Sequence, residues 1–159
     1  MQRLAKDVLE FIELLNSNSV DYLIVGGHAV GFHGFPRMTG DVDFFVRADE
    51  GNASRMIEVL RLFGLEEAEN LRPALTTVGR SIKIGVAPNR IDVITGISGV
   101  DFTEAWAARV SGHLGSKPVT LIGRDSLLKN KRASGRAKDL LDALEIERVS
   151  TLNQKPATS

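Results

Sequence analysis

Two aspartates separated by one residue are the strongest chemical signal in the sequence. Asp41 and Asp43 lie in the segment Asp41–Val46, whose alternating pattern is typical of a β-strand. Their side chains then share one face of the strand, roughly 7 Å apart at about 3.3 Å per residue. Two such carboxylates repel each other, and a divalent cation with a preference for oxygen ligands, Mg²⁺ or Mn²⁺, relieves that repulsion. A solvated strand face is the alternative, because an Asp-x-Asp pair alone is common.

A third aspartate lies in an unfavourable environment for a single charge. Asp92 interrupts the apolar segment Ile91–Ile94 of the predicted strand Arg90–Thr95 and faces away from Ile91 and Val93. If this strand lies beside Asp41–Val46, the three carboxylates converge. They could then hold two cations roughly 3.5–4 Å apart, as in two-metal phosphoryl-transfer sites. An edge-strand aspartate that faces water is the alternative.

A pair of glycines, Gly26 and Gly27, follows the apolar run Tyr22–Val25 and precedes a short predicted helix, His28–His33. Glycine lets the backbone approach a ligand closely, and backbone amides at a helix N-terminus favour phosphate groups. A plain turn between strand and helix is the alternative. The two histidines are five residues apart, which does not fit the spacing of a helical zinc-binding pair.

Polar residues before the aspartate pair could support it. Arg37 could bind a phosphate or pair with Asp41 or Asp43, and Thr39 could orient a carboxylate through a hydrogen bond. An ordinary surface loop is the alternative interpretation.

Basic residues are concentrated toward the C-terminal end of the chain. They are Lys129, Lys131, Arg132, Arg136 and Lys138. This positive patch could bind a triphosphate or a nucleic-acid backbone. A solvated helix face is the alternative.

The composition excludes several classes of protein. The 159 residues include 20 Lys+Arg and 20 Asp+Glu, so no overall positive charge indicates nucleic-acid or membrane binding. The chain has no cysteine, which excludes disulfides, a thiol nucleophile and Cys-ligated zinc. Its apolar runs are shorter than the roughly 18 residues of a membrane helix. We expect a cytoplasmic protein with one domain, residues 1–150, and a polar tail, residues 151–159.

The hydrophobic pattern predicts helices that alternate with strands in the first half of the chain. Strands are expected at Tyr22–Val25, Asp41–Val46, Ser81–Val86, Arg90–Thr95, Val110–Leu114 and Lys117–Leu121. Helices are expected at Leu4–Leu15, His28–His33, Ala53–Phe63, Asp101–Ala108, Ser126–Arg132 (with Asp125 as N-cap) and Arg136–Arg148. The region Gly64–Val78 gives no clear pattern. The expected fold class is α/β (α+β), with a mixed sheet of about four to six strands flanked by helices.

These motifs together resemble the polymerase-β-type nucleotidyltransferase superfamily. The resemblance rests on Gly26-Gly27, the Asp41-x-Asp43 pair and the later strand aspartate Asp92. It covers roughly residues 20–145 and is nearest to small bacterial and archaeal nucleotidyltransferase-like proteins, which include abortive-infection toxins.

The resemblance implies a nucleotidyltransferase-like fold and a role for each motif. Asp41, Asp43 and Asp92 would be the metal-binding, catalytic residues, and Asp92 would also activate the attacking hydroxyl. The nucleotide-binding residues would be Gly26, Gly27, His28, Arg37, Thr39, Lys131, Arg136 and Lys138. Many active members carry serine at or just after the second glycine, whereas His28 stands here and can still donate a hydrogen bond.

The activity implied by the resemblance is Mg²⁺-dependent (or Mn²⁺-dependent) nucleotidyl transfer. A nucleoside monophosphate would move from a nucleoside triphosphate such as ATP to a hydroxyl of RNA, protein or a small compound. Larger relatives append a helical acceptor-binding domain for which this chain has little room. A second subunit, in a homodimer, or a cognate antitoxin are therefore the expected protein partners. The alternatives are a catalytically inactive binding or regulatory module with this fold, and a metal-dependent phosphoesterase such as a nuclease.

Overall fold

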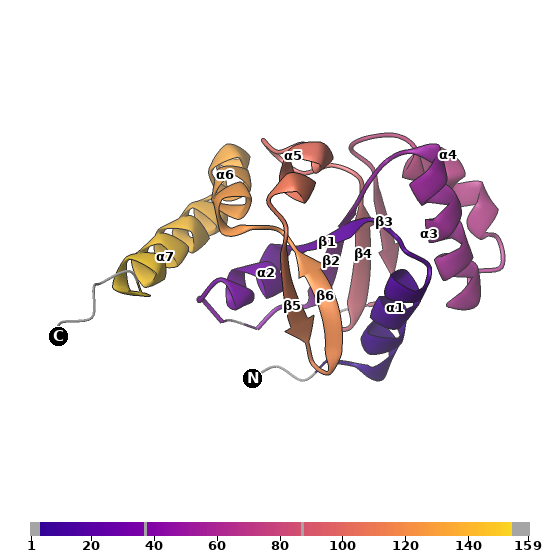
Figure 1. The fold of residues 1–159 in the computed structure, drawn as a ribbon, viewed down its shortest axis with the longest axis horizontal. Helices are drawn as coiled ribbons and strands as arrows, with labels where there is room; N and C mark the ends of the chain where they lie inside the picture. Colours follow the sequence, from indigo (N-terminus) through magenta and orange to yellow (C-terminus); the bar gives the residue numbers. More distant parts are fainter. Residues whose placement is uncertain (1–3, 37, 87, 154–159) are drawn as a thin grey trace.

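A computed structural model describes residues 4–36, 38–86 and 88–153, and shows one mixed sheet with helices on both faces (Figure 1). The strands are β1 (Tyr22–Val25), β2 (Asp41–Val46), β3 (Ser81–Ile84), β4 (Arg90–Ile94), β5 (Val110–Leu114) and β6 (Lys117–Leu121). The helices are α1 (Lys6–Ser17), α2 (Gly26–Phe32), α3 (Glu50–Leu62), the 3₁₀ helix η1 (Ala68–Leu71), α4 (Arg72–Leu75), α5 (Phe102–Ala107), α6 (Arg124–Ser134) and α7 (Ala137–Asn153). The α+β class and the mixed sheet are confirmed.

The six strands are ordered β3-β4-β2-β1-β6-β5. At the centre, β2 runs antiparallel to β1 and parallel to β4. The two predicted hairpins, β3–β4 and β5–β6, form the edges of the sheet. This order places β2, which carries the aspartate pair, between the strand that leads to the glycines and the strand that carries Asp92.

Both faces of the central strands are covered, which explains why β1 is apolar throughout. Tyr22 and Ile24 belong to a core formed with α1 and α3, whereas Leu23 and Val25 belong to a second core formed with α2, α5, α6 and α7. Alternate residues of a strand point to opposite faces, so a strand covered on both sides needs no polar positions.

Several element boundaries differ from the sequence-based expectations. The predicted N-cap Asp125 lies inside the first turn of α6 with an exposed side chain, and Gly123 occupies the N-cap position instead. Helix α7 continues beyond Arg148 to Asn153, so the first three residues of the expected polar tail are helical. The region Gly64–Val78 contains η1 and α4, two short helices that are too brief for a hydrophobic period to be recognised.

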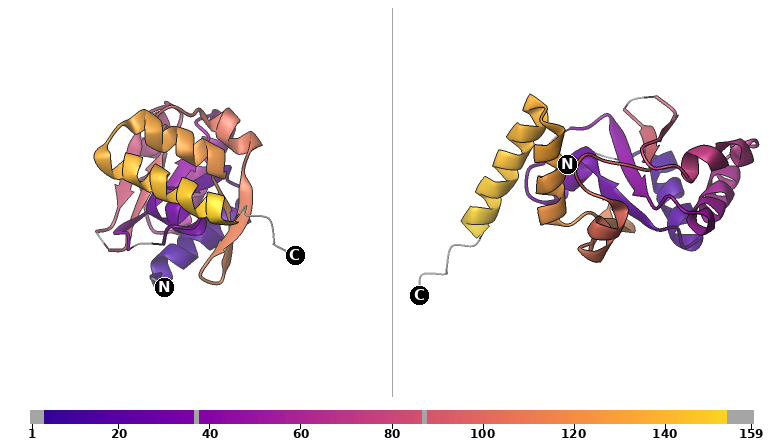
Figure 2. Two further views of the ribbon diagram at one scale, coloured as in Figure 1. Left: turned by 90° about the vertical axis from the view of Figure 1, so that its left-hand side faces the viewer. Right: turned by 90° about the horizontal axis from the view of Figure 1, so that it is seen from above.

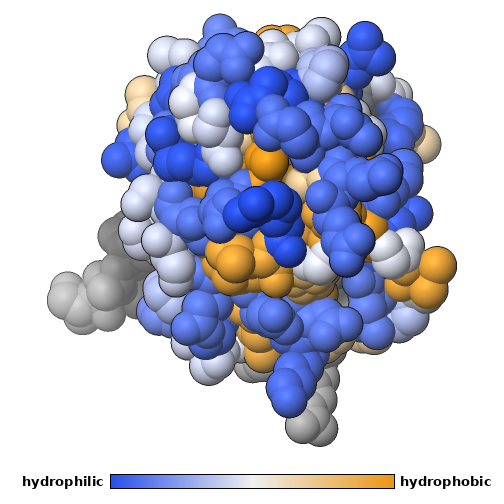
Figure 3. All heavy atoms as spheres, turned by 90° about the vertical axis from the view of Figure 1, so that its right-hand side faces the viewer, coloured by the Kyte–Doolittle hydropathy of each residue, from blue (hydrophilic) through white to orange (hydrophobic). Residues whose placement is uncertain are grey.

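The face of the molecule formed by α3, η1 and α4 is mostly hydrophilic, with some apolar side chains visible between polar ones (Figure 3). Among the described residues, no helix has both the length and the apolar character needed to cross a lipid bilayer.

A buried asparagine fastens α3 to the central strands. Asn52 is fully buried, and its Oδ1 accepts a hydrogen bond from the backbone N–H of Asp21 at 2.8 Å. Its Nδ2 donates to the carbonyl oxygens of Asp21 and Arg47 at 3.1 and 2.9 Å. One amide side chain thus satisfies backbone groups just before β1 and just after β2.

We predict that Asn52→Ala lowers the free energy of unfolding by about 2 kcal/mol or more, because it leaves buried backbone groups without partners. Urea denaturation followed by circular dichroism measures this loss. Asn70→Ala, at an exposed position in η1, is the matched control and should change stability little. Equal effects of the two substitutions would contradict the role assigned to Asn52.

Candidate functional site

Three carboxylates meet on one face of the sheet. Asp43 lies directly opposite Asp92 in the parallel β2–β4 pair, and Asp41 precedes Asp43 by two residues on the same face. One oxygen from each of Asp41, Asp43 and Asp92 lies within 4.8 Å of the others. Asp92 is only 5% exposed. The expected convergence of the three aspartates is therefore confirmed.

The predicted glycines lie against this cluster because β1 and β2 are antiparallel. Val25, the last residue of β1, pairs with Asp43, so the chain enters α2 directly beside that carboxylate. Gly26 has a φ of +70°, and a Cβ built there would lie 2.2 Å from Asp43 Oδ2. Both the left-handed backbone and the close approach require glycine.

The loop before β2 also contacts the glycines. A Cβ on Gly27 would lie 2.8 Å from Thr39 Oγ1. The Thr39 hydroxyl donates to the Asp41 backbone carbonyl at 3.2 Å and lies 3.4 Å from Asp41 Oδ1. Thr39 therefore sits where it can orient Asp41. Arg37, the other residue predicted in this loop, lies outside the described residues.

Arg90 is a site residue that the sequence analysis missed. Its Nη2 donates to Asp41 Oδ2 at 2.7 Å, and its Nε donates to Asp92 Oδ1 at 2.9 Å. Arg90 precedes Asp92 by two residues in β4 and pairs in register with Asp41. The period of two along a strand was therefore the signal that could have identified it. The guanidinium partly neutralises the cluster.

The pKa of Asp43 reflects its burial and the two neighbouring carboxylates. Burial first, and then the negative charges of Asp41 and Asp92, raise the pKa of the Asp43 carboxyl from 3.8 to about 7, although Arg90 acts in the opposite direction. The Nζ of Lys83, on β3, lies 3.8 Å from Asp92 Oδ2, and the lysine side chain is largely solvent-exposed. The cluster therefore carries more negative charge than its neighbouring cations balance.

These residues fit a divalent cation. Three carboxylates converge, and carboxylate oxygens are the ligands that Mg²⁺ and Mn²⁺ prefer. The negative charges of Asp41 and Asp92 contribute to the raised pKa of Asp43, and a cation would offset their repulsion. A cation bound by Asp41, Asp43 and Asp92 would have to replace the Arg90 guanidinium on two of them.

The cluster opens into a cleft of about 840 Å³. One wall contains Gly26, Gly27 and Thr39, and the other comes from the end of α6 and the start of α7. The second wall includes three predicted nucleotide-binding residues, Lys131, Arg136 and Lys138. Ten of the eleven predicted site residues lie in the part of the chain that the structure describes, and this cleft brings together all of them except His28.

Lys131 is held in place by acidic residues of α7. The lysine is 6% exposed, and its Nζ lies 2.9 Å from Asp139 Oδ1 and 3.3 Å from Asp142 Oδ2. Burial alone would raise the pKa of Asp139, but hydrogen bonds from Ser134, Lys131 and Arg136 lower it to about 2. Asp139 is thus ionised at neutral pH and fixes the cationic wall of the cleft.

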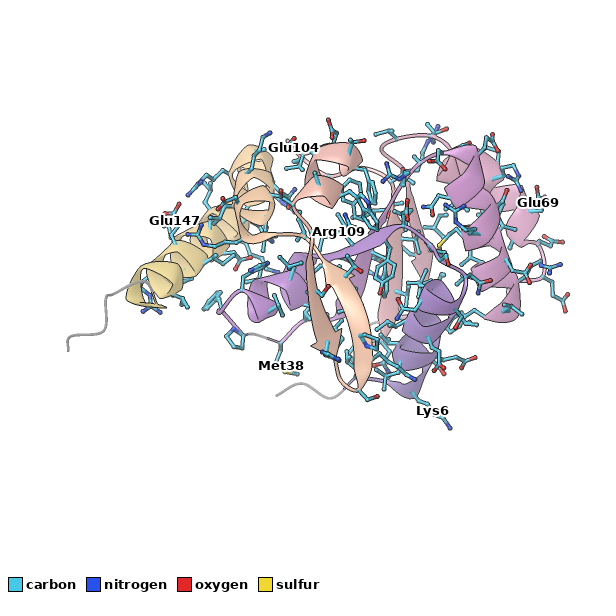
Figure 4. All side chains as sticks on the ribbon, in the orientation of Figure 1. Lys6, Met38, Glu69, Glu104, Arg109 and Glu147 are labelled. Carbon is cyan, nitrogen blue, oxygen red and sulfur yellow. The ribbon has the colours of Figure 1, made fainter. Side chains whose placement is uncertain are left out.

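The basic residues near the C-terminus do not form the concentrated positive patch that was expected. Lys129 pairs with Glu104, and Arg132 pairs with Glu147; Figure 4 labels both glutamates, on α5 and α7. Lys131 and Arg136 share Asp139. Three of these pairs, those of Lys129, Lys131 and Arg132, join residues eight or more positions apart, which a local sequence pattern does not reveal. Asp139, in contrast, lies only three residues after Arg136.

His28 faces a different hollow. It lines an apolar pocket of about 470 Å³ with Phe32, Met38 (labelled in Figure 4) and His113. Burial lowers the pKa of His28, and the negative charge of Asp41 opposes this only partly, so the imidazole is neutral near pH 7. Gly27 lines both hollows, so His28 lies next to the cleft without facing it.

Comparison with known proteins supports the fold. No protein-family model and no curated protein matches the sequence. Among solved structures, the chain is similar to an antigenic nucleotidyltransferase-like protein from Paracoccidioides brasiliensis, with a TM-score of 0.54 and 18% identity. The similarity covers 92% of this chain and 78% of the other. The chain therefore has a nucleotidyltransferase-like fold.

The raised pKa of Asp43 predicts a pH-dependent stability in the absence of metal. Between pH 3.8 and about 7 the folded chain retains a proton that the unfolded chain has lost, so a rise in pH favours unfolding. We expect Asp43→Asn, which stays neutral, to gain in melting temperature relative to the wild type from pH 4 to pH 7 and to level off above. Thermal unfolding with a chelator present measures this difference.

Asp125→Asn is the matched control, because the Asp125 side chain is 92% exposed. Its difference from the wild type should stay nearly constant over the same range. A constant difference for Asp43→Asn as well would contradict the electrostatic description of the cluster.

Proposed function

We propose that this protein is a metal-dependent nucleotidyltransferase that transfers a nucleoside monophosphate from a nucleoside triphosphate to an acceptor hydroxyl. The observation that carries the proposal is the meeting of Asp41, Asp43 and Asp92 beside two glycines, at the end of a cleft with cations on its far wall. The nucleotidyltransferase-like fold supports the same class of reaction. Such chemistry needs positioning and charge neutralisation more than a special nucleophile.

The two walls of the cleft bind the triphosphate in different ways, one through backbone amides and the other through cationic side chains. Gly26 and Gly27 line the cleft at the start of α2, and their backbone amides contact phosphate oxygens. Arg136 and Lys138 are exposed on the opposite wall and neutralise phosphate charge, while Lys131 supplies an ammonium that Asp139 holds still. Fixed charges of this kind stabilise a transition state without reorganising during the reaction.

The aspartates act at the reacting end of the cleft. Asp41, Asp43 and Asp92 hold Mg²⁺ or Mn²⁺, which supplies Lewis-acid polarisation of the phosphoryl oxygens and neutralises developing charge. Asp92 also accepts the proton of the acceptor hydroxyl once Arg90 has moved from its carboxylate. The hydroxyl oxygen then bonds to the α-phosphorus as the bond to pyrophosphate breaks.

We propose a toxin-like member of the fold that modifies RNA, a protein or a small hydroxyl compound in the cytoplasm. An assay of the proposed activity therefore needs RNA, protein and small hydroxyl compounds as acceptors.

Incubation with α-³²P-labelled ATP, CTP, GTP and UTP, Mg²⁺ and cellular RNA, protein or metabolite fractions should label one fraction. Asp41→Asn and Asp92→Asn should each lower labelling by about a hundredfold or more, because each removes a charge that the transition state requires. Asp125→Asn, which removes an exposed charge outside the cleft, should keep wild-type labelling. No labelling with any nucleotide, or equal labelling by Asp41→Asn, would refute nucleotidyl transfer.

Arg90 favours a second candidate function, a nucleotide-binding module without turnover. Its guanidinium bonds to two of the three carboxylates and so already satisfies part of the charge that a cation would neutralise. In such a module the pairing is permanent, and the cleft binds a triphosphate without transfer. Calorimetric binding of a triphosphate by a protein that labels nothing would select this alternative.

Because Arg90 competes with a cation for the same oxygens, we predict that Arg90→Gln raises the affinity for Mn²⁺ on the order of tenfold. Isothermal titration of Mn²⁺, together with the rise in melting temperature that Mn²⁺ produces, measures the effect. Arg47→Gln is the matched control, because Arg47 pairs with Asp21 outside the cleft. An unchanged or weaker Mn²⁺ affinity in Arg90→Gln would show that Arg90 does not compete with the cation.

A further inference from the structure

The outward face of α7 exposes a stripe of leucines. Leu140, Leu141 and Leu144 are 42%, 57% and 62% exposed. Figure 2 shows α7 lying beside α6 at one end of the molecule, with its outer side toward solvent. Contiguous exposed leucines on one helix face are typical of a contact surface.

The opposite face of α7 is buried against the rest of the protein, whereas the leucine face is exposed. Ala143 and Ile146 are buried in the core that α7 shares with α2, α5 and α6. Gly34 lies against Val149, since a Cβ on that glycine would be 2.6 Å from Val149 Cγ1. A helix that covers a core with one side normally has charged residues on the other. Here the other side exposes three leucines among its charged residues.

We propose that this face binds α7 of a second copy of the chain, with the two helices antiparallel. Ala137, Leu141, Leu144 and Arg148 recur at intervals of four, three and four residues, the spacing of a coiled-coil seam. In an antiparallel pair, Leu141 faces Leu144 of the second copy. The same register places the small Ala137 opposite the long Arg148, so the volumes are complementary.

Charge selects the second copy and the antiparallel direction. Lys138 and Glu145 lie on the same flank of the stripe, seven residues apart. In an antiparallel pair equal flanks meet, so Lys138 faces Glu145 of the second copy, and the two-fold symmetry repeats this contact. Within one chain Glu145 pairs with Arg148 at 2.9 Å, so its carboxylate would accept from both cations. In a parallel pair unlike flanks meet, so Glu145 would face Leu140 of the second copy, and Lys138 would have no acidic residue of α7 opposite it.

The size of the surface sets the expected strength. Helix α7 has 17 residues, about 25 Å in length, so the helix pair alone buries less than a stable dimer usually does, about 800 Å² per subunit. The dimer should therefore dissociate on dilution. Lys138 belongs to the cleft as well as to the flank, so the two clefts open beside the seam. Association of the two helices does not depend on the chemistry of the cleft.

Analytical ultracentrifugation over a concentration series tests the association. We expect a monomer–dimer equilibrium that Leu144→Glu weakens at least tenfold, because it places two like charges in the apolar seam. Leu62→Glu is the matched control, since Leu62 on α3 is similarly exposed at 54% and should leave the equilibrium unchanged. Circular dichroism verifies that both variants fold. A wild type that stays monomeric, or a dimer that Leu144→Glu leaves intact, would overturn the proposal.

Cysteine cross-linking tests the direction of the helices, because the natural chain has no cysteine. A mixture of Ala137→Cys and Arg148→Cys chains should form a disulfide between copies, whereas Ala137→Cys alone should not. In the antiparallel register the two Ala137 positions lie about 16 Å apart, beyond the reach of a disulfide. Rapid cross-linking of Ala137→Cys alone would indicate parallel helices and overturn the arrangement.

Discussion

Repulsion among three carboxylates is the constraint on which the site depends. Asp41, Asp43 and Asp92 are held on one face of adjacent strands by backbone pairing, so they cannot separate without breaking the sheet. The fold tolerates them through the Arg90 guanidinium and a protonated Asp43 at moderate pH. A cation would remove the need for both. The sheet thus holds three carboxylates at an electrostatic cost that a bound cation would relieve.

The same pairing positions the rest of the cleft. Antiparallel β1 brings Gly26 against Asp43, and parallel β4 brings Asp92 beside it. The far wall is built differently, since Asp139 fixes the Lys131 ammonium where α6 meets α7. Backbone register therefore sets one side of the cleft, and a buried ion pair sets the other. Both place charged groups at defined positions, as the proposed reaction requires.

The sequence was sufficient for the strands and the aspartates, because both rest on local patterns. Alternation identified β2, and an isolated carboxylate in an apolar strand identified Asp92. The partners of the basic residues could not be predicted in this way. Lys131 looks like a free cation in the sequence, and only the turn at Gly135 folds Asp139 back onto it. Asp125 likewise looks like an N-cap, but the chain enters α6 two residues earlier.

A crystal of the protein soaked with Mn²⁺ and a non-hydrolysable nucleoside triphosphate tests the central claim most directly. Anomalous scattering locates the manganese independently of the protein atoms. We expect a peak bound by oxygens of Asp41, Asp43 and Asp92, with the triphosphate in the cleft and Arg90 displaced from the carboxylates. A cluster without an anomalous peak, in which Arg90 still pairs with Asp41 and Asp92, would contradict the claim that these aspartates form a metal centre.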